Sequence, residues 1–222
     1  MIPDADERET WQARLEAHLA QMAGGTDGAH DAHHLRRVWR SARRIAATEP
    51  GADLMVLLAA AYLHDLVNPP KDSPLRAQAS RLSARDARPL LAGMGFDPER
   101  LDAVAHAIEA HSFSAGIAPT TLEARILQDA DRLEALGAIG LARCFYTGGK
   151  LGTELWDAAD PMGQSGRRLD DSRCSVDHFF LKLLRLPGQM GTAEGRRLAG
   201  RRAQVLTLFL RQLVAELDEG PV

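Results

Sequence analysis

The chain has 222 residues, 45% of them hydrophobic, which is enough for one well-buried domain. Its formal net charge is −3 and its arginines are spread along the sequence, so we expect no dedicated nucleic-acid surface. The apolar run at 54–63 is far shorter than the roughly 20 residues that span a bilayer, and the acidic start lacks the form of a signal peptide. We therefore expect a cytoplasmic protein without membrane association, and we leave open whether it forms a homo-oligomer.

Almost every periodic segment predicts a helix. Alanine, leucine, arginine and glutamate dominate, β-branched residues are sparse, and no stretch alternates long enough for a strand. The sequence therefore predicts an all-α helical bundle that forms a single domain over residues 1–222. The expected helices, in chain order, cover residues 6–23, 31–48, 53–65, 74–92, 97–111, 120–133, 138–146, 176–186 and 192–218.

Capping signals predict where several of these helices begin. Ser73-Pro74 and Asp97-Pro98 each combine an N-cap residue with a proline in the first turn. Residues 120–123, Thr-Thr-Leu-Glu, have the pattern of a capping box, in which Thr120 and Glu123 bond each other's backbone.

Residues 147–175 differ from the rest of the chain. This segment is rich in glycine and aspartate and has little periodicity, which predicts a long irregular loop before the C-terminal helices at 176–218. Long loops often act as lids. We therefore expect it to move over the functional site and to become ordered when substrate binds.

The most informative feature is His64-Asp65, which ends the apolar run of the helix expected at 53–65. A buried helix that delivers an imidazole and a carboxylate side by side must satisfy both, because unpaired buried polar groups cost several kcal/mol. A divalent metal ion satisfies both at once. Nitrogen and oxygen ligands together suit Mn²⁺, Fe²⁺, Co²⁺, Ni²⁺ or Zn²⁺, whereas Mg²⁺ normally prefers oxygen.

Two other segments offer further ligands, each with an alternative. In the second His-Asp pair, His30-Asp31, the aspartate is suited to cap a helix, so His34, about one turn inside that helix, is the more useful residue. His30 shares a face with His34 and is kept as a supporting residue. Asp129 and Asp131 diverge by about 200° on a helix, so only one of them can face an ion.

The order His34-x-x-Arg37-Val38, His64-Asp65 and Asp129-Ala130-Asp131-Arg132-Leu133 resembles the HD-domain superfamily of metal-dependent phosphohydrolases, whose pattern is H…HD…D. The resemblance implies an HD-type bundle with a metal-site core at about 25–140. It implies His34, His64, Asp65 and Asp131 as ligands of one divalent ion, for which we favour Mn²⁺. Asp131 is preferred because the last aspartate of the family sits in an A-D-x-L setting. Further segments resemble small bacterial HD proteins, some of which are nucleotide pyrophosphatases: 63–68, 71–74, 111–114 and 177–180.

Several cationic residues are candidates for binding a phosphorylated substrate. Lys71 is expected on the loop after Asp65, where it would serve as a point charge for phosphate. His111 is expected at a helix end, where contact with phosphate and a favourable interaction with the helix dipole are equally good explanations. Weaker candidates for the same role are Arg37, Arg76 and Arg132.

These residues predict a metal-dependent phosphohydrolase in which Asp65, Lys71 and His111 take part in catalysis. The expected substrate is small and phosphorylated, with a nucleoside triphosphate cleaved to monophosphate and pyrophosphate as the favoured reaction. The general acid is open between Asp72, His111 and assistance by metal and lysine, because Asn68 stands where some HD nucleotidases have glutamate. The alternatives are a phosphomonoesterase, a cyclic-nucleotide phosphodiesterase and a nucleotide-binding regulatory module without turnover.

Overall fold

The computed structural model describes residues 5–22, 32–69, 73, 75–112 and 115–218. Across these residues the regular structure is helical, with one isolated bridge between Glu154 and Cys174, so the predicted all-α class is confirmed. The contacts divide the chain into two compact units, Met1–Asp131 and Arg132–Val222. The expectation of a single domain stays a prediction. No helix in the described ranges is both long and apolar enough to cross a membrane.

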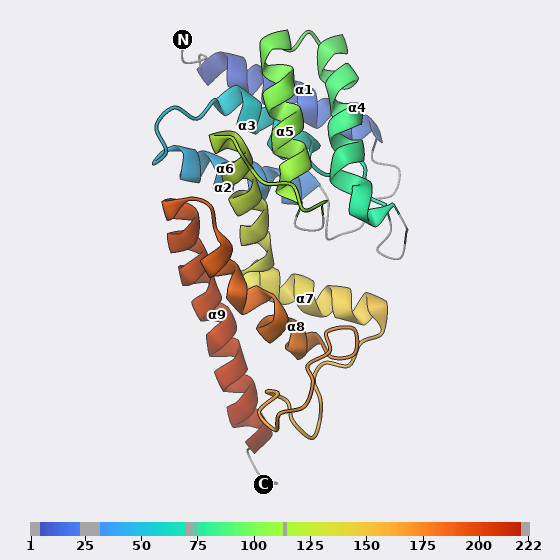
Figure 1. Cartoon of the computed structure of the whole chain (residues 1–222), viewed down its shortest axis with the longest axis vertical. Helices are drawn as coiled ribbons and strands as arrows, with labels where there is room; N and C mark the ends of the chain where they lie inside the picture. Colours follow the sequence, from blue (N-terminus) through green and yellow to red (C-terminus); the bar gives the residue numbers. More distant parts are fainter. Residues whose placement is uncertain (1–4, 23–31, 70–72, 74, 113–114, 219–222) are drawn as a thin grey trace. The chain divides into compact units, whose positions relative to one another are not determined.

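Helix α3 is the centre of the first unit. It packs against the other helices around it, and every residue from Met55 to Leu63 is buried, as expected for a helix that is apolar on all sides. Helices α4 and α5 lie side by side as a pair (Figure 1). The helices of this unit are α1 (Ala5–Met22), α2 (Ala32–Ala46), α3 (Leu54–Leu63), α4 (Ala79–Gly93), α5 (Leu101–His111) and α6 (Leu122–Arg132).

Side-chain caps fix the beginnings of α3 and α6 together. The Asp53 carboxylate accepts hydrogen bonds from the backbone N–H groups of Met55 and Val56, at 2.8 and 3.2 Å. Thr121, not Thr120, caps α6, because its Oγ1 accepts from the Ala124 N–H at 3.1 Å. The predicted capping box is therefore wrong. The Glu123 carboxylate instead accepts from the backbone N–H of Asp53 at 2.9 Å and ties the two helix beginnings to each other.

The other predicted caps are partly realised. Asp97 accepts from the Glu99 N–H at 2.9 Å and begins a 3₁₀ turn, Pro98–Arg100, that leads into α5. Ser73 Oγ accepts from the Leu75 N–H at 3.2 Å, but a 3₁₀ turn at Arg76–Gln78 precedes the α-helix. The helix predicted to begin near residue 74 therefore becomes α-helical only at Ala79.

The second unit contains α7 (Gly137–Leu151), α8 (Ser175–Leu181) and α9 (Ala193–Asp218). Helix α7 continues to Leu151 and ends at Gly152, which takes the left-handed conformation with φ 71°, so the irregular loop begins later than predicted. The continuous helix predicted at 176–186 is wrong. Lys182 leaves helical geometry, with φ −133° and ψ −61°, and a 3₁₀ segment, Leu183–Gln189, follows, in which Pro187 has no N–H to continue an α-helix.

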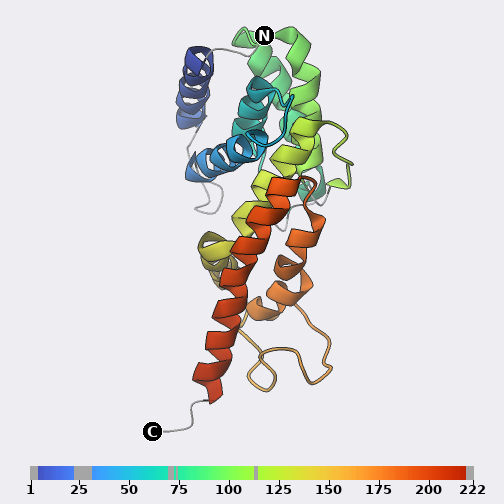
Figure 2. The same ribbon diagram turned by 90° about the vertical axis from the view of Figure 1, so that its left-hand side faces the viewer.

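The loop between α7 and α8 is organised by one arginine and three aspartates, which we call the loop cluster: Asp157, Asp160, Arg167 and Asp177. Arg167 donates to both carboxylate oxygens of Asp177 at 2.6 Å. Asp160 accepts from the backbone N–H groups of Gln164 and Ser165, at 2.8 and 3.0 Å. In Figure 2 this orange loop extends from the second unit, in which α9 packs against α7 and the 3₁₀ segment.

Candidate metal centre

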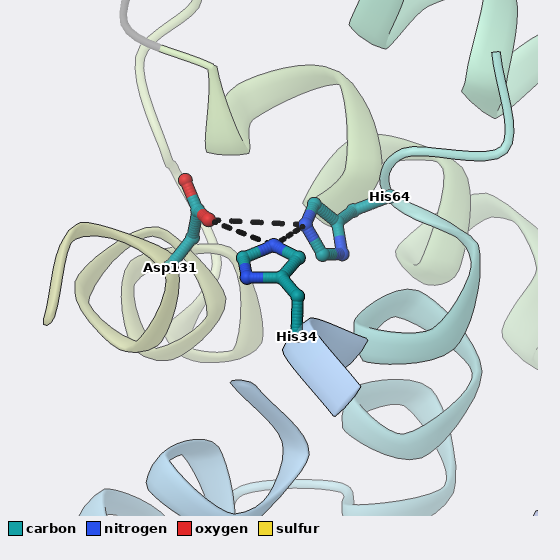
Figure 3. A group of neighbouring side chains, drawn as sticks. All are labelled: His34, His64 and Asp131. Carbon is teal, nitrogen blue, oxygen red and sulfur yellow. Dashed lines mark hydrogen bonds and ion pairs between the residues drawn. The ribbon is translucent and has the colours of Figure 1, made fainter. Parts of the chain in front are cut away.

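Three helices of the first unit deliver His34, His64 and Asp131 to one point. His34 lies in the first turn of α2, His64 is the residue that ends α3, and Asp131 lies near the end of α6. The two Nε2 atoms are 3.3 Å apart, and Asp131 Oδ1 lies 3.5 Å from His34 Nε2 and 3.8 Å from His64 Nε2. Figure 3 shows the two rings and the carboxylate pointing toward one another.

Asp65 and His111 extend this group, and we call the five residues the metal centre. Asp65 Oδ2 lies 3.7 Å from His64 Nε2 and 3.9 Å from His34 Nε2. Its other oxygen, Oδ1, faces His111 Nε2 at 3.8 Å. The His64 and His111 rings stand edge to face, with centroids 4.7 Å apart. Asp65 therefore has one oxygen toward each half of the centre.

The backbone orients two of the imidazoles. His64 Nδ1 is 3.0 Å from the Ala61 carbonyl oxygen, and His111 Nδ1 is 2.6 Å from that of Ile108. A carbonyl only accepts, so we assign the proton of each neutral ring to Nδ1, where it is donated. The lone pair of each Nε2 then faces the centre, which is the orientation that a histidine ligand requires.

Electrostatics favour an ionised carboxylate at Asp131 and a neutral ring at His111. Burial opposes ionisation of Asp131, but the neighbouring His64 and His34 rings favour it, and its pKa lies below the ordinary value. For His111 the uncharged form is favoured instead. Burial, and then the nearby His64 ring, lower its pKa and favour the neutral form. Neutral imidazole with carboxylate is the donor set that transition-metal ions prefer.

The spacing of these donors also fits an ion. Metal–ligand bonds of about 2.0–2.2 Å place neighbouring donor atoms about 2.8–3.6 Å apart, from octahedral to tetrahedral geometry. In the structure the three donor atoms that dashed lines join in Figure 3 are separated by 3.3, 3.5 and 3.8 Å. Two groups, His34–His64–Asp131 and His64–Asp65–His111, each have their donor atoms within 4.8 Å of one another. The residues therefore fit a divalent metal ion.

The choice between the two aspartates agrees with this geometry. Asp131, whose side chain is 30% exposed, belongs to one of the two groups of donors. Asp129 is fully buried and belongs to neither. The ligand roles themselves remain predictions, but the arrangement is that of the preferred set.

Sequence reasoning missed that His111 lies within the centre and not only near it. A signal was present. Val104, Ala107, Ile108 and His111 recur at helical spacing and are all buried, so the pattern places His111 on the inward face of α5. His106 lies off this face. Its Nε2 accepts from the Thr120 N–H at 3.1 Å.

For the other described residues predicted to bind substrate, the structure shows contacts or positions outside the metal centre. Arg76 donates to the Asn68 side chain and, at 3.2 Å, to the Pro69 carbonyl, in the segment that follows Asp65. Arg37 is half-buried on α2. Arg132 donates to the Gln189 carbonyl at 2.6 Å within the second unit. Four residues with predicted roles lie outside the described ranges: His30, Asp31, Lys71 and Asp72.

The chain is similar to several known proteins. A family model described as HD domain matches residues 31–136. The chain is 32% identical to YpgQ of Bacillus subtilis over 220 residues, which cover 97% of this chain and 95% of YpgQ. A crystal structure of YpgQ in complex with ADP has a TM-score of 0.68 to this structure, with the same coverage. An HD-superfamily hydrolase from Bacillus thuringiensis is 28% identical, with a TM-score of 0.71 and coverage of 96% and 98%.

Proposed function

The chain belongs to the HD-domain superfamily, and we propose that it is a phosphohydrolase that cleaves nucleoside triphosphates between the α and β phosphorus atoms. Membership makes it a protein of the metal-dependent hydrolase kind. The observation that carries the proposal is the convergence of His34, His64 and Asp131 donor atoms at 3.3–3.8 Å. The ADP complex of YpgQ supports a nucleotide as the substrate class.

We assign His34, His64, Asp65 and Asp131 as the residues that hold the ion, with Mn²⁺ favoured for a mixed nitrogen and oxygen set. When bound, such an ion makes a water molecule more acidic and polarises a phosphoryl oxygen. The chain itself fixes the donors. The Ala61 carbonyl holds the His64 ring, and the Ile108 carbonyl holds the His111 ring against the second oxygen of Asp65. Asp65 can therefore bind the ion through one carboxylate oxygen and hold a proton on the other.

Cleavage next to a pyrophosphate leaving group is favoured by the positive residues expected around the substrate. Negative charge accumulates on pyrophosphate as the bond breaks, so donors beyond the metal ion help it most. Lys71, Arg76, Arg37 and Arg132 are the proposed phosphate contacts, together with His111. For Lys71 the proposal rests on its place in the sequence. Lys71→Ala should lower kcat more for a triphosphate than for an aryl phosphate, whose leaving group needs little help.

The test is a substrate screen with purified protein. Nucleoside mono-, di-, tri- and cyclic phosphates are incubated with Mn²⁺, and the products are identified by ³¹P NMR. Asp131→Ala, purified in parallel, reports contaminating phosphatases. We expect monophosphate and pyrophosphate from triphosphates, in the wild-type sample alone.

Each other outcome selects one of the alternatives. Inorganic phosphate released directly from every triphosphate, without pyrophosphate, contradicts the proposed bond. Turnover of monophosphates alone establishes a phosphomonoesterase, and turnover of cyclic nucleotides alone establishes a phosphodiesterase. Metal-dependent nucleotide binding without any product indicates a regulatory module.

A further inference from the structure

A groove of about 680 Å³ opens between α1 and α2, with Tyr62 of α3 at its base. Its volume lies within the range of small-molecule sites. None of its lining residues belongs to the metal centre, although α2 carries His34 and α3 leads to His64. The groove is therefore a separate feature of the first unit.

Arginine dominates the lining of the groove. Arg36, Arg40, Arg43 and Arg44 recur at helical spacing and so share one face of α2. One carboxylate, Glu16 of α1, is also part of the lining. A concave surface that carries charge of one sign concentrates its field and attracts ions of the opposite sign. Positive charge gathers in the groove although the net charge of the whole chain is −3.

Glu16 pairs with Arg36. Its carboxylate accepts from Arg36 at 3.1 and 2.7 Å and from the Tyr62 hydroxyl at 2.5 Å. The bond from Arg36 lowers the pKa of Glu16 to about 2, so it is ionised at all physiological pH values. Of the groups that line the groove, Arg40 and Arg43, farther along α2, are therefore sources of excess positive charge.

Trp39 makes part of this surface rigid. Its indole N–H donates to the Gln12 side chain at 3.1 Å, which bridges α2 and α1. The Arg43 guanidinium lies 5.7 Å from the centre of the Trp39 ring, close enough for a cation–π interaction that restricts the arginine. A guanidinium held in place loses less freedom when it binds a phosphate group, and its planar fork matches phosphate oxygens.

We propose that this groove binds a phosphorylated small molecule of nucleotide size through its di- or triphosphate group. The inference does not depend on the reaction at the metal centre. A free nucleotide and an inorganic polyphosphate share the recognised chemistry, and the experiment separates them. Exposed Arg40 and the restrained Arg43 are the expected contacts.

The test is isothermal titration calorimetry of the full chain in EDTA, which removes metal-dependent binding at the catalytic site. The ligands are inorganic triphosphate, ATP and adenosine. We expect both phosphorylated ligands to bind and adenosine not to bind, with affinity that falls as salt is added. Tighter binding of ATP than of inorganic triphosphate identifies a nucleotide site, and the reverse identifies a polyphosphate site.

Charge-reversal variants test whether the ligand binds in this groove. Arg40→Glu should raise the Kd for inorganic triphosphate about tenfold or more, since a charge-assisted contact becomes a repulsion. Arg81→Glu, an equally exposed change on α4, is the matched control and should leave the Kd unchanged. The proposal is overturned if neither phosphorylated ligand binds in EDTA, if adenosine binds as well as ATP, or if both variants bind like wild type. Because these titrations contain no metal ion, their failure is distinguishable from failure of the proposed hydrolysis.

Discussion

The metal centre of the first unit and the loop cluster of the second unit both gather aspartates, but they surround them with opposite partners. In the loop cluster, Asp177 meets the two-pronged guanidinium of Arg167 at 2.6 Å and the backbone N–H of Asp170 at 2.7 Å. In the metal centre, the atoms that face Asp65 and Asp131 are imidazole nitrogens. For His64 and His111 the opposite nitrogen is bonded to a carbonyl, so the facing nitrogen is an acceptor.

The comparison teaches that burial alone does not identify a ligand. The Asp177 side chain is 0% exposed and yet is structural, whereas that of Asp131 is 30% exposed. What distinguishes the two carboxylates is the charge of the groups that face them. A carboxylate that faces an arginine already has its cation, and one that faces other acceptors has room for an ion among them.

Removing a ligand should have the largest effect. We expect Asp131→Ala, His64→Ala and Asp65→Ala each to reduce kcat by at least about a thousandfold and to abolish stoichiometric Mn²⁺ binding, because each leaves an incomplete set of donors. Activity assays and metal analysis after gel filtration measure this, and circular dichroism should show that the helical fold persists.

Asp129→Asn is the matched control for Asp131. It preserves the shape of a buried side chain that lies outside the groups of donors. We expect its metal content to stay close to that of wild type, with a loss of activity of at most about 10–100-fold, as for residues that support ligands. If Asp129→Asn lost the metal and Asp131→Ala kept it, the choice between the aspartates would be wrong.

Breaking the loop cluster should affect stability and not the metal. Asp177→Ala removes a buried carboxylate that accepts from Arg167 and from the Asp170 N–H, so the free energy of unfolding should fall by about 1–3 kcal/mol. Urea denaturation of the full chain measures the change. Asp171→Ala is the control. Its exposed carboxylate pairs with His178 at 2.8 Å, and such surface pairs contribute at most about 1 kcal/mol. Loss of Mn²⁺ binding in Asp177→Ala would contradict the separation of the two clusters.

His111→Ala tests how far the metal centre extends. His111 Nε2 lies 3.8 Å from Asp65 Oδ1 and belongs to the group of donors that includes His64 and Asp65, so its removal should weaken Mn²⁺ affinity and kcat by about 10–100-fold. His178→Ala removes a histidine that is bonded to Asp171 in the second unit and should change neither. Unchanged metal affinity with a raised KM in His111→Ala would instead assign this residue to phosphate binding alone.

The sequence could predict features that depend on local interactions, but not those that depend on tertiary packing alone. Helix beginnings at Asp53 and Asp97 were predictable because a cap is a local interaction, and all-α class followed from composition. The metal centre was predictable only through the family resemblance, since α2, α3 and α6 meet by tertiary packing. The pair Arg167–Asp177 was not predictable, because the loop between its members has no periodicity that would place them together.

Acid should weaken the loop cluster selectively. The Arg167 guanidinium, bonded to Asp177, holds the pKa of that carboxyl below its ordinary value. The group therefore contributes stability above the ordinary aspartate pKa, near pH 4, and loses it as the pH falls through the lower, folded value. The free energy of unfolding should therefore fall more steeply in wild type than in Asp177→Asn between pH 5 and 3. Parallel pH profiles for the two proteins would contradict this assignment.

The smallest effect concerns the segment at residues 147–175, which the sequence suggested as a lid and whose irregular part in the structure is 152–174. In the structure, hydrogen bonds from Gln164, Ser165 and Asp170 to aspartates of the loop cluster already order it. Ordering by substrate requires a segment that is not yet ordered, so we expect slow amide exchange at these three positions that does not change when Mn²⁺ and a non-hydrolysable triphosphate are added. Hydrogen–deuterium exchange with mass spectrometry measures this. A rise in protection confined to the loop would restore the lid, and the loop cluster would then be a closed state that substrate selects rather than a permanent scaffold.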